Sequence, residues 1–260
     1  MSLFESSDTP LDITILVMPD ASLMSLAATL DPMRAANRIA AKELYRWKVV
    51  SLDGQPARTS CGLPIPVVEA FQPKARRDIL LVVAAFNVFR HSTPRALHAI
   101  ATGARHSTMT GGIEAGSWVL ALAGLLDGRR ATTHWEDLEE FAARFPDVEV
   151  QPDRWVIDGP IFTTGGAMPA LDLMLALIRT RQGYSTALDV ASVYIYDQTK
   201  NASDAQPLVS VGRIGHTEPR VGQAIRIMEA HIDRPLAIAE IARRLTVSTR
   251  RLETLFRQSV

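Results

Sequence analysis

Cysteine, long apolar runs and targeting signals are scarce or missing in this sequence. Cys61 is the single cysteine among 260 residues, so no internal disulfide can form, which fits a reducing compartment. No apolar run reaches the roughly 18 residues that would cross a membrane. The N-terminus lacks the basic segment and apolar core of a signal peptide. We therefore expect a cytoplasmic protein with no membrane partner.

Signatures of cofactor and metal sites are missing as well. The 6 histidines are scattered without metal-ligand spacing. The glycine pairs at residues 111–112 and 165–166 lack the Lys-Ser/Thr or the third glycine of nucleotide-binding loops. We expect neither a metal nor a cofactor.

Neither sign of charge dominates the whole chain, but basic residues dominate its C-terminal segment. The sequence carries 28 basic and 28 acidic residues. Residues 220–260 hold eight arginines and four acids, a net charge of +4 that leaves −4 on the rest. A basic tail on an acidic body predicts a polyanionic partner such as DNA for the tail. The alternative is a solvated basic helix face.

Alternating strand and helix patterns fill the first 198 residues. Apolar runs predict strands over residues 11–18, 47–52, 78–83, 106–110 and 161–164, with shorter ones at 65–68, 131–135, 148–150 and 155–157. Helical spacing predicts helices over 23–41 (with a kink or restart at Pro32), 94–102, 116–126, 138–144, 169–181 and 186–196. We expect an α/β three-layer sandwich with a mainly parallel sheet.

The last sixty residues have a different organisation. Residues 199–219 are rich in polar residues, Gly and Pro and have little apolar periodicity, which predicts a linker. Helical spacing resumes at residue 220 and breaks at 246–248, the pattern of a helix–turn–helix, with Ser248 as a good N-cap for the second helix. We expect three parts: a domain over 1–198, a linker over 199–219 and a small all-α segment over 220–260.

The second helix of this pattern presents polar side chains on its outer face. Thr249, Arg250, Arg251, Glu253 and Thr254 lie in its N-terminal half, where arginine reaches guanine edges or phosphates. We expect these five residues to contact DNA. The alternative is a helical hairpin with a charged outer face.

The run GGIEAGSW over residues 111–118 lies between a predicted strand and a predicted helix. Gly-x-X-x-Gly at such a junction is the form of a nucleophile elbow, in which the flanking glycines permit a sharp turn that exposes the central side chain. An enzyme places Ser or Cys at the centre, and this chain has Glu114. The helix that follows favours the ionised form of that carboxylate through its dipole.

Ser248, Arg250, Leu252 and Phe256 form a pattern that resembles the first helix–turn–helix of the AraC/XylS regulator family. The resemblance implies DNA binding and regulation of transcription. That family often has Arg where this chain has Thr254, and its DNA-binding domain has two such motifs. The chain holds the first motif only, so we expect a partial DNA-binding domain that needs the second lobe for full affinity.

The run ALAGLLDGRRATTHW over residues 121–135, followed by GG at 165–166 and LD at 171–172, resembles the PfpI-type, class I glutamine amidotransferase-like domain. The resemblance implies a flavodoxin-like sandwich. Catalytic relatives have Cys at the elbow and a supporting carboxylate, where this chain has Glu114 and, by alignment, Ser25. A carboxylate cannot perform thiolate chemistry, so we expect no enzyme. The alternative is a hydrolase of this class in which Glu114 is an unusual nucleophile or base.

Regulators of this type with an acidic elbow residue respond to arginine- or betaine-like metabolites, which implies a small, cationic, amino-acid-derived effector. A fixed carboxylate suits such a cation, and an aromatic wall suits a quaternary amine. The candidate effector-binding residues are Glu114, Ala115, Trp118, His134 and Trp135. We also expect a homodimer, because such modules read paired half-sites. Two alternatives stay open: Glu114 is satisfied by backbone N–H groups or an arginine and binds nothing, or the domain is only a dimerisation scaffold.

Overall fold

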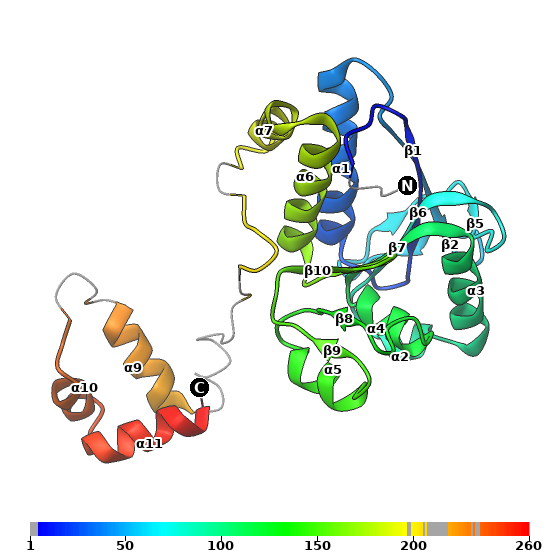
Figure 1. Ribbon diagram of the computed structural model, residues 1–260. Coiled ribbons are helices and arrows are strands. Elements are labelled where there is room, and N and C mark those ends of the chain that lie inside the picture. The colour runs from blue at the N-terminus through cyan, green and yellow to red at the C-terminus, as the bar shows by residue number, and fades with distance from the viewer. Residues whose placement is uncertain are drawn as a thin grey trace. The chain divides into compact units, whose positions relative to one another are not determined.

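The computed structural model describes residues 5–196, 199–204, 206, 218–229, 231 and 235–259 (Figure 1). The chain divides into two compact units, Met1–Gln206 and Pro207–Val260, which we call the large unit and the small unit. Among the described residues, no helix is long and apolar enough to cross a membrane.

The large unit is built on a seven-stranded sheet with the strand order β10-β11-β7-β6-β1-β2-β5. These strands are β1 (Leu11–Val17), β2 (Tyr45–Ser51), β5 (Glu69–Ala70), β6 (Arg77–Ala84), β7 (Ser107–Glu114), β10 (Trp155–Asp158) and β11 (Ile161–Thr164). Neighbouring strands are parallel, except β10 and β11, which are antiparallel. The sheet confirms the mainly parallel α/β fold that the sequence predicts.

Helices and two small sheets complete the large unit. The helices are α1 (Leu23–Ala40), α2 (Val88–His91), α3 (Pro94–Arg105), α4 (Gly116–Leu122), α5 (Leu138–Arg144), α6 (Ala167–Gln182) and α7 (Tyr184–Val193). The small sheets pair β3 (Ala57–Arg58) with β4 (Pro64–Ile65), and β8 (Arg130–Ala131) with β9 (Glu149–Val150).

Alternate side chains of the central strand β6 belong to two separate apolar clusters. Ile79, Leu81 and Val83 pack in one cluster with side chains from α1, α6 and α7. Leu80 and Val82 pack in the other with side chains from α3, α4 and α5. The helices therefore form layers on both faces of the sheet (Figure 1). A strand covered on both faces needs apolar side chains in both directions, which explains its almost unbroken apolar sequence.

Some predicted bounds differ from those in the structure. β7 continues to Glu114, beyond the predicted end at residue 110. Gly111 suits the strand there because a Cβ at this position would lie 2.2 Å from the ring of Phe162. α4 ends at Leu122 instead of residue 126, and Gly124 shortly after it has a left-handed φ of 69°. α1 runs unbroken through Pro32, so the predicted restart is wrong.

The start of the predicted linker is hydrogen-bonded to the large unit. Gln206 is buried, and its side-chain amide donates to the backbone oxygens of Thr133 at 2.9 Å and Asp153 at 2.8 Å. The described residues of 199–206 therefore belong to the large unit. The rest of the linker up to residue 217 lies outside the described residues.

The small unit consists of α9 (Pro219–Glu229), α10 (Ile238–Arg244) and α11 (Thr249–Ser259). Its buried core includes Ala224 from α9, Ala242 from α10 and Leu252 from α11. The turn between α10 and α11 contains Thr246 with a left-handed φ of 56°. Ser248 caps α11, because its Oγ accepts a hydrogen bond from the backbone N–H of Arg251 at 3.2 Å.

Candidate functional site

Close backbone contacts hold the turn between β7 and α4. Glu114 at the end of β7 has a left-handed φ of 56°, a conformation that residues other than glycine rarely adopt. A Cβ at Gly112 would lie 2.7 Å from Ser117 N, and a Cβ at Gly116 would lie 2.1 Å from Val82 O. Ser117 Oγ donates to Glu114 O at 2.9 Å. The turn therefore requires both glycines and places a strained residue between them.

Ser25 on α1 holds the carboxylate of Glu114. Its hydroxyl donates a hydrogen bond to Glu114 Oε2, and Ser25 itself is fully buried. The backbone N–H of Glu114 donates to Thr164 Oγ1 at 3.4 Å. Among the described residues, neither an arginine nor a backbone N–H donates to the carboxylate. The sequence analysis considered that backbone N–H groups or an arginine satisfy this carboxylate. The structure shows the Ser25 hydroxyl as its donor instead.

Ionisation of Glu114 is less favourable in the folded protein than in a free carboxyl, contrary to the effect expected from the helix dipole. Burial raises the pKa of Glu114 above its ordinary value of 4.5, and the Ser25 hydrogen bond and the nearby His134 oppose that rise. Asp137 contributes further to the rise through repulsion. Burial also raises the pKa of Asp137. A ligand cation close to both acids would stabilise their ionised forms.

Glu114 lines a pocket of about 330 Å³ that lies beyond the carboxyl ends of β6 and β7. Three further acids line it: Glu136, Asp137 and Glu140. Neither lysine nor arginine occurs among the described residues that line it, and His134 is the single base. The pocket is therefore suited to positive charge and unsuited to an anion.

Aromatic rings add an apolar surface to this acidic pocket. Phe86 and Phe89 line it and are 58% and 51% exposed. Trp118 is buried beneath them, with its ring edge-on to Phe89 at 5.5 Å between centroids. The guanidinium of Arg144 lies 4.6 Å from the centre of the Phe89 ring, so one face of this ring is already next to a cation. The exposed ring of Phe86 has no such neighbour among the described residues.

Four of the five residues predicted for effector binding line this pocket: Glu114, Ala115, Trp118 and His134. The fifth, Trp135, lies with its ring 5.7 Å from that of His134 and is not one of the lining residues. The pocket thus gathers most of the predicted set, and its role in binding stays a prediction.

Residues that the sequence analysis did not single out complete the pocket: Phe86, Phe89, Glu136, Asp137 and Glu140. The two phenylalanines follow β6, which is adjacent and parallel to β7. Because the carboxyl ends of parallel strands meet at one edge of a sheet, the segment after β6 had to lie beside the elbow. The position of this segment thus follows once β6 and β7 are known to be neighbours, whereas the exposure of its two rings does not.

The residues predicted to contact DNA lie on α11. Arg250, Arg251 and Glu253 are exposed, and Thr249 and Thr254 are half-buried. Thr254 Oγ1 donates to the backbone oxygen of Arg250 at 2.8 Å, so this hydroxyl already has a partner within the helix. No carboxylate in the described part of the chain pairs with Arg250 or Arg251. Both guanidinium groups are therefore available to a polyanion.

Two other arginines of the small unit are already paired. Glu240 on α10 accepts hydrogen bonds from Arg243 at 2.8 Å and from Arg244 at 3.0 Å. These partners lower the pKa of Glu240 to about 2. Of the arginines on α10 and α11, those without a carboxylate partner among the described residues therefore lie on α11.

Comparisons with known proteins agree with the α/β fold of the large unit and with the helix–turn–helix of the small unit. Residues 12–180 match the sequence model of the DJ-1/PfpI family. The HTH-type transcriptional regulator CdhR of Pseudomonas aeruginosa is 39% identical over 246 residues, which are 95% of this chain and 73% of CdhR. The crystal structure of an AraC family transcriptional regulator from Pseudomonas putida has a TM-score of 0.60 at 25% identity and covers 71% of this chain and 100% of that one.

An enzyme also occurs among the similar proteins. Isonitrile hydratase of Pseudomonas putida is 29% identical over 180 residues, which are 68% of this chain and 75% of the hydratase. The similarity to CdhR, by contrast, covers 95% of this chain and therefore reaches into the small unit.

Proposed function

The chain belongs to the DJ-1/PfpI family, and we propose that it is a transcriptional regulator whose large unit binds a small cationic metabolite and whose small unit binds DNA. In this proposal the domain over residues 1–198 senses the effector and the segment over 220–260 contacts DNA. A cytoplasmic location is part of this proposal, because a regulator of this kind works where the DNA is.

The carboxylate of Glu114 at the elbow is the observation that carries the proposal. The turn has the close contacts and the strained φ of an elbow, yet it presents a group that cannot act as a thiolate. Ser25 holds that group where a supporting carboxylate is expected in the catalytic relatives. We infer that the scaffold is not used for thiol chemistry and that the carboxylate is a binding group.

The chemistry of the pocket supports a cation as the effector. Glu114 and three other acids face a pocket that has only a histidine as a basic lining group. Exposed aromatic rings at the same place favour a quaternary ammonium or a guanidinium, which loses less on leaving water than a compact ammonium. A volume of about 330 Å³ fits a small metabolite. An amino-acid derivative with such a group is the effector class that we propose.

The small unit supports DNA binding through α11. Arg250 and Arg251 are exposed near its N-terminus, where a recognition helix meets base edges and phosphates. Modules of this kind usually read paired half-sites, so we propose that the protein acts as a homodimer.

A thermal-shift screen of the chain against arginine, betaines, polyamines and matched neutral or anionic amino acids tests the effector proposal. A ligand that binds only the folded state raises the apparent stability. We expect stabilisation by at least one cation and none by its neutral or anionic analogue. Stabilisation by none of these compounds would favour a dimerisation scaffold without a ligand.

An enzyme with Glu114 as nucleophile or base is the second candidate. Two observations favour it: the pKa of Glu114, which burial raises above its ordinary value as in many catalytic acids and bases, and the similarity to isonitrile hydratase. Turnover of an isonitrile by the wild type that disappears in Glu114→Gln would establish this alternative. We expect no turnover by either protein.

A further inference from the structure

The opposite edge of the sheet carries a second cavity, far from Glu114. It lies where β1, β6 and β7 begin, and its volume is about 580 Å³. β7 runs from Ser107 at this cavity to Glu114 at the elbow, a distance of roughly 23 Å at the rise of a parallel strand. A ligand here would therefore not touch the effector pocket.

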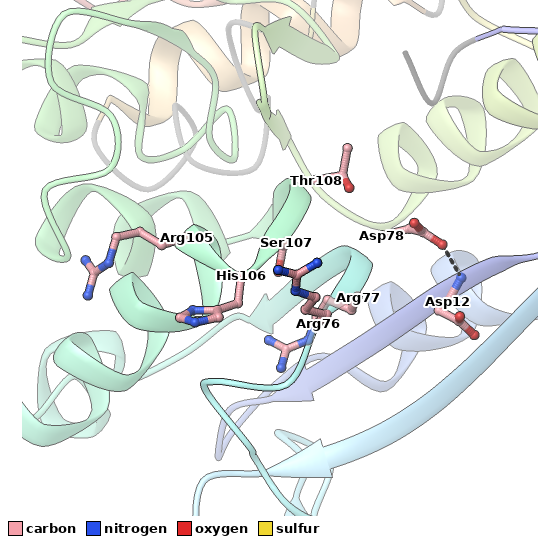
Figure 2. A pocket seen from close by; sticks show the side chains of 8 residues that line it. All are labelled: Asp12, Arg76, Arg77, Asp78, Arg105, His106, Ser107 and Thr108. Atoms are coloured by element: carbon pink, nitrogen blue, oxygen red, sulfur yellow. Dashed lines mark hydrogen bonds between the residues drawn. The ribbon is translucent and has the colours of Figure 1, made fainter. Parts of the chain in front are cut away.

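The cavity is lined by several cationic side chains (Figure 2). Arg76, Arg77 and Arg105 line it together with His106. Arg76 and Arg105 are exposed, and no carboxylate of the described residues lies within ion-pair distance of any of the three arginines. The Nδ1 atom of His106 is 2.9 Å from the backbone oxygen of Thr102, so it carries the proton and Nε2 remains without a partner in the described part of the chain.

The two acids at this cavity are already occupied. Asp12 binds the guanidinium of Arg46 through both carboxylate oxygens, at 2.8 and 3.0 Å. Asp78 accepts a hydrogen bond from the backbone N–H of Asp12 at 2.8 Å, which Figure 2 shows as a dashed line. Asp78 keeps its negative charge, but neither carboxylate forms an ion pair with Arg76 or Arg105 in the described part of the chain.

Arg77 is a buried cation without a counter-ion among the described residues. It is 7% exposed, stacks over Phe71 with its guanidinium carbon 5.0 Å from the ring centre, and donates from Nη2 to the backbone oxygen of Gln72 at 2.5 Å. Its Nε and Nη1 atoms have no hydrogen-bond partner within the described ranges of the chain. Burial lowers the pKa of its guanidinium, a sign that the charge is poorly compensated. A buried charge of this kind favours an anion in the adjacent cavity.

We propose that this edge of the sheet binds a small multivalent oxyanion, a phosphate compound or a polycarboxylate, at a site separate from the effector pocket. Arg76 binds its oxygens directly from the rim, as guanidinium groups do with phosphate and carboxylate. Arg105, whose Nη2 now donates to Thr102 Oγ1 at 3.1 Å and whose side chain extends away from Arg76 in Figure 2, turns to join it by exchanging that hydrogen bond for the anion. Arg77 contributes positive potential from below, and the cavity has room for an anion larger than inorganic phosphate.

Calorimetric titration of the full chain with pyrophosphate and with citrate, at fixed ionic strength, tests the proposal. Fixed ionic strength removes differences in screening between the two anions. We expect saturable binding of at least one anion. Binding of pyrophosphate alone identifies a phosphate ligand, binding of citrate alone a polycarboxylate, and both results support the site. Absence of saturable binding by either anion at millimolar concentration overturns it.

Two arginines on α3 provide a matched pair of variants. Arg105→Ala removes a lining side chain, whereas Arg95→Ala removes an exposed arginine of the same helix that does not line the cavity. Because both side chains are exposed, neither substitution disturbs the core. We expect Arg105→Ala to raise Kd roughly tenfold or more and Arg95→Ala to change it less than about twofold. An equal loss in the two variants would show attraction by overall charge and would overturn the site.

Discussion

Glu114→Gln is the substitution that isolates the charge of the elbow residue, because the side chain keeps its size and can still accept from Ser25. If the effector is a cation, the variant loses a charge-assisted contact in a half-buried pocket, which contributes about 2 kcal/mol. That loss raises Kd for the effector about thirtyfold.

The lower affinity of Glu114→Gln for the effector can be measured as a smaller effector-induced rise in Tm. At an effector concentration of about 100 times the wild-type Kd, binding adds about 2.7 kcal/mol to the free energy of unfolding, or about 8 °C for a unit of this size. The same concentration is only about 3 times the Kd of the variant. It then adds about 0.8 kcal/mol, or about 2 °C.

Glu139→Gln is the matched control, since Glu139 is exposed on α5 and does not line the pocket. It should keep the full shift of about 8 °C. An equal shift in wild type and Glu114→Gln, or a loss in Glu139→Gln as large as in Glu114→Gln, would refute the role assigned to the elbow carboxylate.

Four further predictions follow from the contacts described above. Lowering the pH should weaken effector binding as Glu114 is protonated, beginning above the ordinary value of 4.5 because its pKa is raised; titrations across pH should show a smaller dependence for Glu114→Gln, which keeps Asp137 and its raised pKa. Ser25→Ala removes a hydrogen bond that lowers the Glu114 pKa, so the pH range over which effector binding weakens should move upward; titrations of the variant across pH check this. Gly116→Ala forces a Cβ against Val82 O and should lower the free energy of unfolding in urea by about 3 kcal/mol; an unchanged midpoint would contradict the close contact. Arg251→Ala should raise the Kd for specific DNA roughly tenfold or more, with the effector-induced thermal shift unchanged.

The raised pKa of Glu114 also sets the sign of its effect on stability without effector. A folded-state pKa above the unfolded value means that its contribution is fully present below about 4.5 and is lost as pH rises through the folded-state pKa. The Tm difference between wild type and Glu114→Gln should therefore move in favour of the variant as pH increases. This cost of an ionised Glu114 is what a bound cation would offset.

The sequence carried enough information to locate the elbow but not the whole pocket. Gly112 and Gly116 mark the turn because a Cβ at either position would collide with backbone atoms. The need for glycine at these two positions is visible in the local sequence. Phe86 and Phe89 sit in an apolar segment that looks like core. Their exposure depends on how α2 packs beside the elbow, which no local pattern specifies.

The ends of helices also could not be predicted fully from the sequence. The apolar run after Gly116 continues to Leu126, but α4 ends at Leu122, because the chain turns before Gly124, which has a left-handed φ. The predicted linker has little apolar periodicity, yet Gln206 within it is buried because its amide finds acceptors on the large unit. Both differences arise from tertiary contacts, whereas the parallel sheet follows from apolar strands that are covered on both faces.

The most direct test of the account is the binding of this protein to the DNA upstream of its own gene, followed by fluorescence anisotropy with and without the effector found in the thermal-shift screen. We expect sequence-selective, salt-dependent binding in wild type and Glu114→Gln alike, of reduced affinity because the small unit holds one helix–turn–helix motif. An effector concentration that saturates the wild type should change the binding of the wild type and leave that of Glu114→Gln largely unchanged. Binding that is indifferent to DNA sequence, or an identical effector response in the two proteins, would contradict it.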